Sequence, residues 1–290
     1  MSSSLYPDNM RLRLSVVIPT LGGPQLVDTI RSINAGSICP AEILVCIPEV
    51  SGVTGIESFG DNVKVISTKS VGQVPQRAEG FECAAGNVVL QVDDDFQLSH
   101  DCLEILWGNL RTLGHGNVVG PAFYDSVTKR PLHEYKKGFA GFLKSLNAFV
   151  FAAAPWGERR MGRLTSLGIA YGFDPEIVNQ ELVESDWLPG GCVLGYKDDL
   201  VVERFFPFSG KAFSEDVMHS LLRRRKGVRH FVATKARAMT RVESEGMIWR
   251  GFTAELKARR HVVSLLRGSI LRFYVWAASQ IIVRVLKWSV

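Results

Sequence analysis

Apolar positions recur with two different spacings in the first 125 residues, and the two spacings alternate along the chain. Short apolar runs with the length of a buried strand cover residues 13–20, 42–47, 63–67, 88–92 and 117–123. Between several of these runs the apolar spacing is helical, which predicts helices over about 26–33, 74–85 and 101–113. This alternation predicts an α/β fold with a mainly parallel sheet flanked by helices on both faces.

The pattern is looser over residues 124–186, which we expect to form an insertion above the sheet. Within this segment, Phe139 to Trp156 is apolar with large side chains at helical spacing. Such spacing is more typical of a packed helix than of a lid or a membrane-facing helix. After the insertion we expect a short strand ending near Tyr196, a helix with Ser214 as N-cap, and final strands over 229–234 and 236–242.

The chain from Trp249 onward has the pattern of a basic, amphipathic, helical extension. Its uncharged run over 273–283 has 11 residues, whereas a helix needs about 20 apolar residues to cross a bilayer. We therefore expect a domain over 1–246, an extension over 247–290 and no spanning segment. Two interpretations remain open: residues 249–290 lie in the interface of an anionic membrane, or they pack on the domain or on a second subunit in a homodimer.

Composition and charge narrow the class of protein. The 290 residues are 46% hydrophobic and 22% charged, which is ordinary for a globular protein. The net charge of +5 is unevenly distributed: residues 1–216 carry 18 Lys and Arg against 26 Asp and Glu, and residues 217–290 carry 16 against 3. A basic region of this kind suits an anionic membrane or a phosphate-bearing substrate, and we expect no nucleic-acid partner because no recognition motif is present.

Cysteine usage and the N-terminal sequence predict the location. The five cysteines are odd in number and form no CxxC pair, so we interpret them as reduced residues. The N-terminus has no basic start followed by an apolar core, so we expect no secretory signal. The sequence thus predicts a cytoplasmic protein, peripheral on the inner face of the membrane if the basic extension binds lipid.

The strongest chemical signal is the run Asp93-Asp94-Asp95 at the end of an apolar strand. Adjacent carboxylates repel one another, and ligands of parallel α/β sheets bind beyond the carboxyl ends of the strands. A divalent cation with oxygen ligands is therefore one expected occupant. An acidic turn or helix cap is an equally good interpretation of the triplet alone.

Two further motifs lie downstream, in the turn Trp187-Leu188-Pro189-Gly190-Gly191 and in the helix start Glu215-Asp216. The paired glycines permit close approach of the backbone to a ligand, although a tight turn with a buried Trp explains them as well. The chain has no G-x-G-x-x-G after its first strand and no P-loop, so the usual signals of dinucleotide and nucleoside-triphosphate binding are missing.

Taken in order, the Ile18-Pro19-Thr20 strand end, the Asp triplet, the Trp-Leu-Pro-Gly-Gly-Cys turn and the Glu-Asp helix start resemble family 2 glycosyltransferases. The resemblance covers roughly residues 13–245. It implies the Rossmann-type GT-A fold, with residues 124–186 inserted over the active site. It also implies transfer of a sugar from a nucleotide-diphosphate sugar to an acceptor hydroxyl, with inversion, in polysaccharide or glycolipid synthesis on a glycan or lipid-linked acceptor.

On the donor side, the resemblance implies that Asp95 and Asp93 hold Mg2+ or Mn2+, which offsets the charge of the departing diphosphate. Asp93 or Asp94 would also lie near the ribose. The remaining nucleotide-sugar-binding residues would be Pro19, Thr20, Glu49 and Arg77.

On the acceptor side, the resemblance implies that Asp216 is the general base that takes the proton of the acceptor hydroxyl. Glu215 would orient the acceptor, and Trp187 would stack on a sugar face beside Gly190 and Gly191.

The chain also departs from the family pattern. Glu49 stands where the family usually has an Asp-Asp-x-Ser-type sequence. Near the last strand, where the family often has a metal-binding histidine, this chain has Thr240 and Arg241, and the nearest histidine is His230. Arg241 is a candidate contact for the diphosphate or a solvated surface residue. The alternative functions are a nucleotidyltransferase, disfavoured because no Lys or Arg follows Thr20 closely, and a non-catalytic membrane-associated adaptor.

Overall fold

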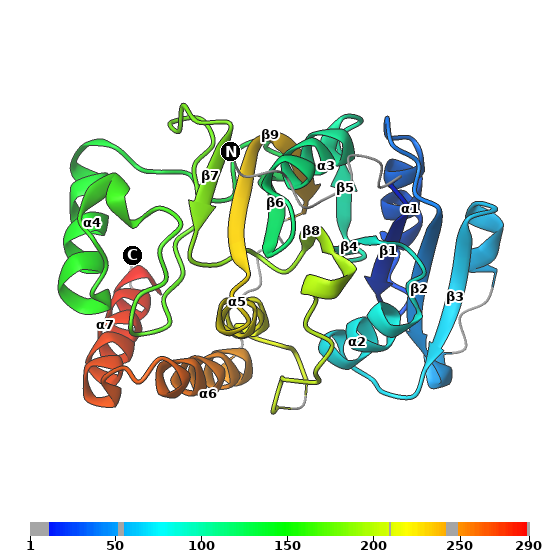
Figure 1. Cartoon of the computed structure of the whole chain (residues 1–290). Helices are drawn as coiled ribbons and strands as arrows, with labels where there is room; N and C mark the ends of the chain where they lie inside the picture. Colours follow the sequence, from blue (N-terminus) through cyan, green and yellow to red (C-terminus); the bar gives the residue numbers. More distant parts are fainter. Residues whose placement is uncertain (1–11, 52–54, 209, 242–248, 289–290) are drawn as a thin grey trace.

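The structure is a computed structural model that describes residues 12–51, 55–208, 210–241 and 249–288. Within them, nine strands form one sheet in the order β3-β2-β1-β4-β8-β6-β9-β5, and β7 pairs with β9 (Figure 1). The strands are β1 (Leu14–Pro19), β2 (Glu42–Pro48), β3 (Val63–Thr68), β4 (Val88–Val92), β5 (Phe96–Leu98), β6 (Asn117–Asp125), β7 (Leu182–Ser185), β8 (Cys192–Tyr196) and β9 (Arg229–Thr240).

The predicted α/β fold is confirmed, with a more mixed sheet than the alternation indicated. Strands β1 to β4 run parallel to one another, and β6 runs parallel to β9. Strand β8 lies antiparallel between β4 and β6, and β5 and β7 are antiparallel to β9. The two predicted final strands are one strand, β9, whose pairing with β6 shifts register at Pro121/Ala122. Residue 242, the predicted end of the last strand, lies outside the described residues.

Helices cover both faces of the sheet because its strands are apolar on both sides. Helices α1 (Leu26–Asn34) and α3 (Cys102–Leu113) pack on the face formed by Val16, Ile18 and their neighbours, and α2 (Gln73–Cys83) packs on the opposite face around Val17. Helix α5 (Glu215–Arg225) contacts β9. The predicted helix over 74–85 ends at Cys83, so Ala85 is exposed and not part of its apolar stripe.

The apolar segment of the insertion forms α4 (Gly138–Ala152), but the prediction of a helix packed through its large side chains is wrong. The buried positions of α4 are the small residues Gly141, Ser145, Ala148 and Ala152. Six of its large apolar side chains are 41–77% exposed, namely Phe139, Phe142, Leu143, Leu146, Phe149 and Val150. Spacing alone cannot tell which of two apolar stripes is buried, and here the small residues permit the close approach.

Two helices follow the domain, α6 (Trp249–Leu265) and α7 (Ile270–Trp288). Helix α6 packs under α5, with Ala258 and Val262 against Val217 and Met218. Helix α7 contacts α6 and α4, so α4 and α7 form the end of the molecule opposite β3 (Figure 1). The predicted boundary at 246/247 lies outside the described residues. No helix in the described part of the chain is long and apolar enough to cross a membrane.

Candidate active site

Most of the predicted donor residues gather at the carboxyl ends of β1, β2 and β4. Thr20 follows β1 and is buried, whereas Glu49 follows β2 and is exposed. Gln76 of α2 fixes the first two strand ends, because its amide nitrogen donates to the carbonyl oxygens of Thr20 and Cys46, each at 2.7 Å. Pro19 is the last residue of β1 and is buried, so it shapes this edge from within the sheet.

The three carboxylates after β4 point in three directions. Asp93 accepts from Arg77 Nη2 at 3.1 Å and from Gln73 Nε2 at 2.7 Å. Asp94 accepts from the hydroxyl of Thr20. Asp95 accepts from Thr240 Oγ1 at 3.0 Å, across the pairing of β5 with β9. Only Asp93 has a cationic partner among the described residues.

Burial and mutual repulsion make the other two carboxylates costly to ionise. Burial raises the pKa of Asp94, and the charge of Asp93 raises it further, although the hydroxyl of Thr20 acts against both. The pKa of Asp95 is raised by burial and by the charge of Asp93, against the lowering effect of Thr240. A cation beside Asp94 and Asp95 would remove this penalty.

The side chains of the Asp triplet offer oxygen ligands, which are the kind of ligand that Mg2+ and Mn2+ prefer. Among the described residues, no three His, Cys, Asp or Glu side chains form a group that could hold a metal ion. Asp95 lines a cavity of about 160 Å³ together with Thr240 and the exposed Arg241. His230 lies at the other end of β9 from Thr240, buried, with its pKa lowered to about 3 by burial and by nearby arginines.

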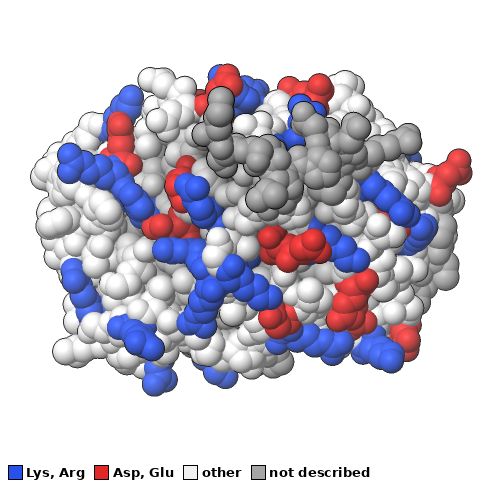
Figure 2. All heavy atoms as spheres, viewed as in Figure 1, with Lys and Arg blue, Asp and Glu red and all other residues white. Residues whose placement is uncertain are grey.

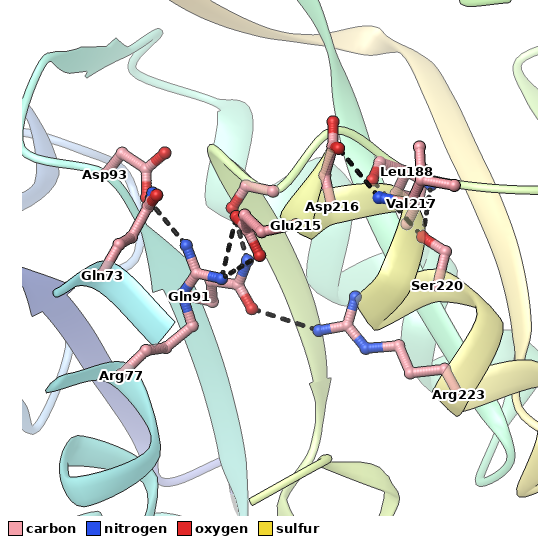
Figure 3. A network of polar contacts seen from close by, with 11 residues as sticks. Gln73, Arg77, Gln91, Asp93, Leu188, Glu215, Asp216, Val217, Ser220 and Arg223 are labelled. Carbon is pink, nitrogen blue, oxygen red and sulfur yellow. Dashed lines mark hydrogen bonds and ion pairs between the residues drawn. The ribbon is translucent and has the colours of Figure 1, made fainter. Parts of the chain in front are cut away.

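Arg77 is the centre of a buried polar network that joins α2, β4 and α5 (Figure 3). Its guanidinium is only 2% exposed, and it pairs with Glu215 at 3.1 Å as well as with Asp93. Burial alone would lower the pKa of Arg77, but the two carboxylates outweigh it and raise the pKa. The structure therefore places Arg77 between two acids, Asp93 after β4 and Glu215 at the start of α5.

Asp216 lies next to this network, in the first turn of α5, and its carboxylate points away from Arg77 (Figure 3). One carboxylate oxygen accepts from the backbone amide of Val217 at 2.8 Å, and the side chain is partly exposed. Burial raises the pKa of Asp216 to about 7, with a further contribution from the charge of Glu215. A carboxylate with a pKa near neutrality is suited to accept a proton as a general base.

The residues of the predicted acceptor turn serve packing in this structure. A side chain at Gly190 would meet the carboxylate of Glu215 at 2.5 Å, and one at Gly191 would meet the ring of Phe96 at 2.3 Å. Trp187 is 5% exposed, and its indole nitrogen donates to the carbonyl oxygen of Tyr171 at 3.0 Å. The indole therefore supports the turn from behind, edge-on to His133.

Sequence reasoning missed a second buried arginine, Arg223 at the end of α5. It donates to Gln91 of β4 at 3.1 Å, and Gln91 in turn donates to the carbonyl oxygen of Gly190. Burial lowers the pKa of Arg223 to about 9, and the charge of Arg77 lowers it further. A polar Gln inside an otherwise apolar strand was the one signal in the sequence for this network.

In this chain the carboxylates after β4 are joined through the buried ion pairs of Arg77 to the acidic start of α5. The chain belongs to the glycosyl transferase family 2, whose sequence model matches residues 15–164. Membership of this family makes glycosyl transfer, rather than nucleotidyl transfer, the activity to propose below. The matched range includes the Asp triplet and ends before the Trp187 turn and Asp216.

Two solved structures share the fold. The chain is similar to GalNAc-T7, solved with UDP, GalNAc and Mn2+, with a TM-score of 0.59, 16% identity and coverage of 81% of this chain and 44% of that chain. It is also similar to residues 1–349 of S. aureus TarS, with a TM-score of 0.50, 14% identity and coverage of 87% and 65%. The chain thus spans less than two thirds of either neighbour. No curated protein matches the sequence.

Proposed function

We propose that the chain is a metal-dependent, inverting glycosyltransferase that uses a nucleotide-diphosphate sugar to extend a glycan or lipid-linked acceptor in polysaccharide or glycolipid synthesis. The observation that carries the proposal is Asp216, a partly exposed carboxylate with a pKa of about 7, linked through Glu215, Arg77 and Asp93 to the end of β4. A base near the acceptor and an acidic edge near the donor are the two parts that sugar transfer needs.

In the proposed step, Asp216 takes the proton of the acceptor hydroxyl while the hydroxyl oxygen forms a bond to the anomeric carbon of the donor sugar. The bond from that carbon to the diphosphate breaks on the opposite face, which inverts the configuration. Asp95, with Asp93 beside it, would hold Mg2+ or Mn2+, which supplies positive charge for the leaving diphosphate. Thr20, Asp94 and the exposed Glu49 would bind the nucleoside, and Arg241 would contact a phosphate.

Arg77 acts as a positioning residue in this proposal. It holds Asp93 on one side and Glu215 on the other, so it fixes the distance between the donor edge and the start of α5. Thr240 has a similar role for Asp95. The turn at Gly190 and Gly191 would bound the acceptor space beside Glu215 and Asp216.

We also propose peripheral binding to an anionic, inner-face membrane through α4 and α7. Neither helix contains Asp or Glu, and both contain Lys or Arg. In α7, Leu271, Tyr274 and Val275 are at least half exposed, beside the exposed apolar side chains of α4. This end of the molecule is mostly white in Figure 2, with blue cationic side chains spaced over it. An apolar surface with cationic flanks suits anionic lipid.

A thermal-shift panel of UDP-, dTDP- and GDP-sugars with and without Mn2+ tests the donor site, since a bound ligand raises the melting temperature. We expect one nucleotide class to raise it only with Mn2+, and EDTA to reverse the shift. Asp95→Ala should remove the Mn2+-dependent part, whereas Asp28→Ala on the exposed side of α1 should keep it. A shift that is the same in EDTA and in Asp95→Ala would contradict the metal assignment.

A further inference from the structure

A large cavity lies beneath α4. It has a volume of about 790 Å³ and is formed by residues 132–135, one side of α4, residues 160–161 and 170–172, and Gln280 of α7. A smaller cavity shares His133 and Gly172 with it and reaches Trp187 and Pro189. The smaller cavity has a volume of about 20 Å³. His133 and Gly172 therefore lie between the large cavity and the turn whose Gly190 lies against Glu215 and Asp216.

The most unusual group in this cavity is Arg160, which is 7% exposed. Its guanidinium lies over the rings of Tyr135 and Tyr171, at 5.0 and 5.7 Å from their centres, and it donates to Ser145 Oγ at 2.7 Å. Its protein neighbours are thus neutral. No ion pair of Arg160 with a carboxylate is found within the described part of the chain.

A buried cation without a counter-ion costs free energy, so a cavity that contains one favours an anionic ligand. Lys144 of α4 adds a second positive charge at the wall. Glu134 is the only acid among the described lining residues, and its carboxylate is bonded to Lys136. Guanidinium and ammonium groups together are typical ligands of phosphate.

The same wall leads to the exposed apolar side of α4. Leu143 lines the cavity and is 48% exposed, and Phe142 and Leu146 are exposed on the same helix. A ligand with its anionic group at Arg160 could therefore lay an apolar chain along α4. Soluble sugars and free phosphate have no apolar chain that could cover that surface.

We propose that this cavity binds an amphipathic, phosphate-bearing acceptor, with the phosphate between Arg160 and Lys144, the head group directed past His133 toward Asp216, and the apolar chain along α4. That this ligand is the acceptor depends on the glycosyltransferase activity proposed above. The binding of a phosphorylated amphiphile to the cavity does not depend on it. The proposal adds to that function the chemical class of its second substrate.

Calorimetric titration with decyl phosphate, decyl maltoside and inorganic phosphate tests the binding, with the amphiphiles below their micelle concentrations. We expect decyl phosphate to bind at least tenfold more tightly than the other two probes. Equal affinity for decyl maltoside would overturn recognition of the phosphate, and equal affinity for inorganic phosphate would overturn the role of the apolar chain. Binding of none of the probes would overturn the site.

Arg160→Gln should weaken decyl phosphate at least tenfold. Arg159→Gln, one residue earlier and exposed outside this cavity, is the matched control and should bind as the unmodified protein does. Because Arg160 is buried, Lys144→Gln at an exposed position provides a second variant that keeps the fold, and it should weaken binding about threefold or more. Unchanged affinity in either cavity variant would overturn the assignment.

The nucleotide-sugar thermal shift on the same variants separates the two proposals. Donor-induced shifts should be identical in unmodified protein, Arg160→Gln and Lys144→Gln, because the cavity lies apart from the Asp triplet. If the unmodified protein responds to a donor while decyl phosphate binds Arg160→Gln undiminished, the cavity inference fails alone. If no donor produces a shift, the proposed function fails, whatever the amphiphile does.

Discussion

Asp216 is the residue whose ionisation distinguishes this site from an ordinary acidic helix start. Its pKa of about 7 lies well above the ordinary aspartate value, so the folded protein binds this proton more tightly than the unfolded chain. The contribution of Asp216 to stability is therefore greatest at low pH. It falls as the pH rises from about 4 to about 7, where the carboxylate becomes ionised in the folded state.

Asp216→Asn removes this titration and should change the pH dependence of stability. Between pH 5 and 8, the unfolding free energy of the variant should rise relative to that of the unmodified protein by about 1–2 kcal/mol, after allowance for the partly exposed carboxylate. Urea unfolding across that range measures the difference. Asp198→Asn, at an exposed position after β8, is the matched control for the loss of one carboxylate. Parallel curves for Asp216→Asn would contradict the raised pKa.

At the residue scale, sequence motifs predicted at which strand end or helix start a residue lies, but they did not predict which residues it contacts. Asp95 and Asp216 could be selected because each follows a recognisable strand end or helix start. The partner of Arg77 could not, since Glu215 is 138 positions away in sequence and only the tertiary fold brings α2 and the start of α5 together. The burial of Trp187 likewise depends on α6 and Tyr171, which no local pattern indicates.

The network around Arg77 ties three elements together, so its loss is a prediction at the scale of elements. Arg77→Met should lower the unfolding free energy by about 3–5 kcal/mol, because Glu215 and Asp93 would lose their buried counter-charge. Arg204→Met is the matched control, since Arg204 pairs with Glu79 of the same helix at the surface and its loss should cost less than about 1 kcal/mol. Equal losses of unfolding free energy in Arg77→Met and Arg204→Met, measured by denaturant unfolding, would show that the buried network does not stabilise the fold.

Long periodic elements could be predicted from sequence, whereas short strands and the orientation of α4 could not. Strands β5 and β7 have 3 and 4 residues, too few to establish a period, and they exist because β9 offers them a partner. Helix α4 has two apolar stripes, and contacts that no local pattern indicates, with α7 and between Ser145 and Arg160, decide that the small residues are buried.

At the scale of the whole molecule, the apolar end formed by α4 and α7 predicts lipid binding. The chain should float with liposomes that contain anionic lipid and much less with neutral liposomes. The double variant Phe142→Ser, Leu146→Ser should reduce flotation severalfold, because it removes exposed apolar area without touching buried positions of α4. Val127→Ser, an exposed apolar residue elsewhere, is the control. Undiminished flotation of the double variant would contradict lipid binding through α4. If the unmodified protein is a dimer and the double variant is a monomer, the apolar surface binds a second copy of the chain instead.

The pH dependence of sugar transfer tests the central claim that Asp216 is the general base. With the donor found in the thermal-shift panel, kcat/KM of the unmodified protein should rise tenfold per pH unit below about 7 and level off above it. Asp216→Asn should lose at least a hundredfold in kcat, show no such rise, and keep its donor affinity. Transfer by Asp216→Asn at an undiminished rate, or with the same rise near pH 7, would contradict the account.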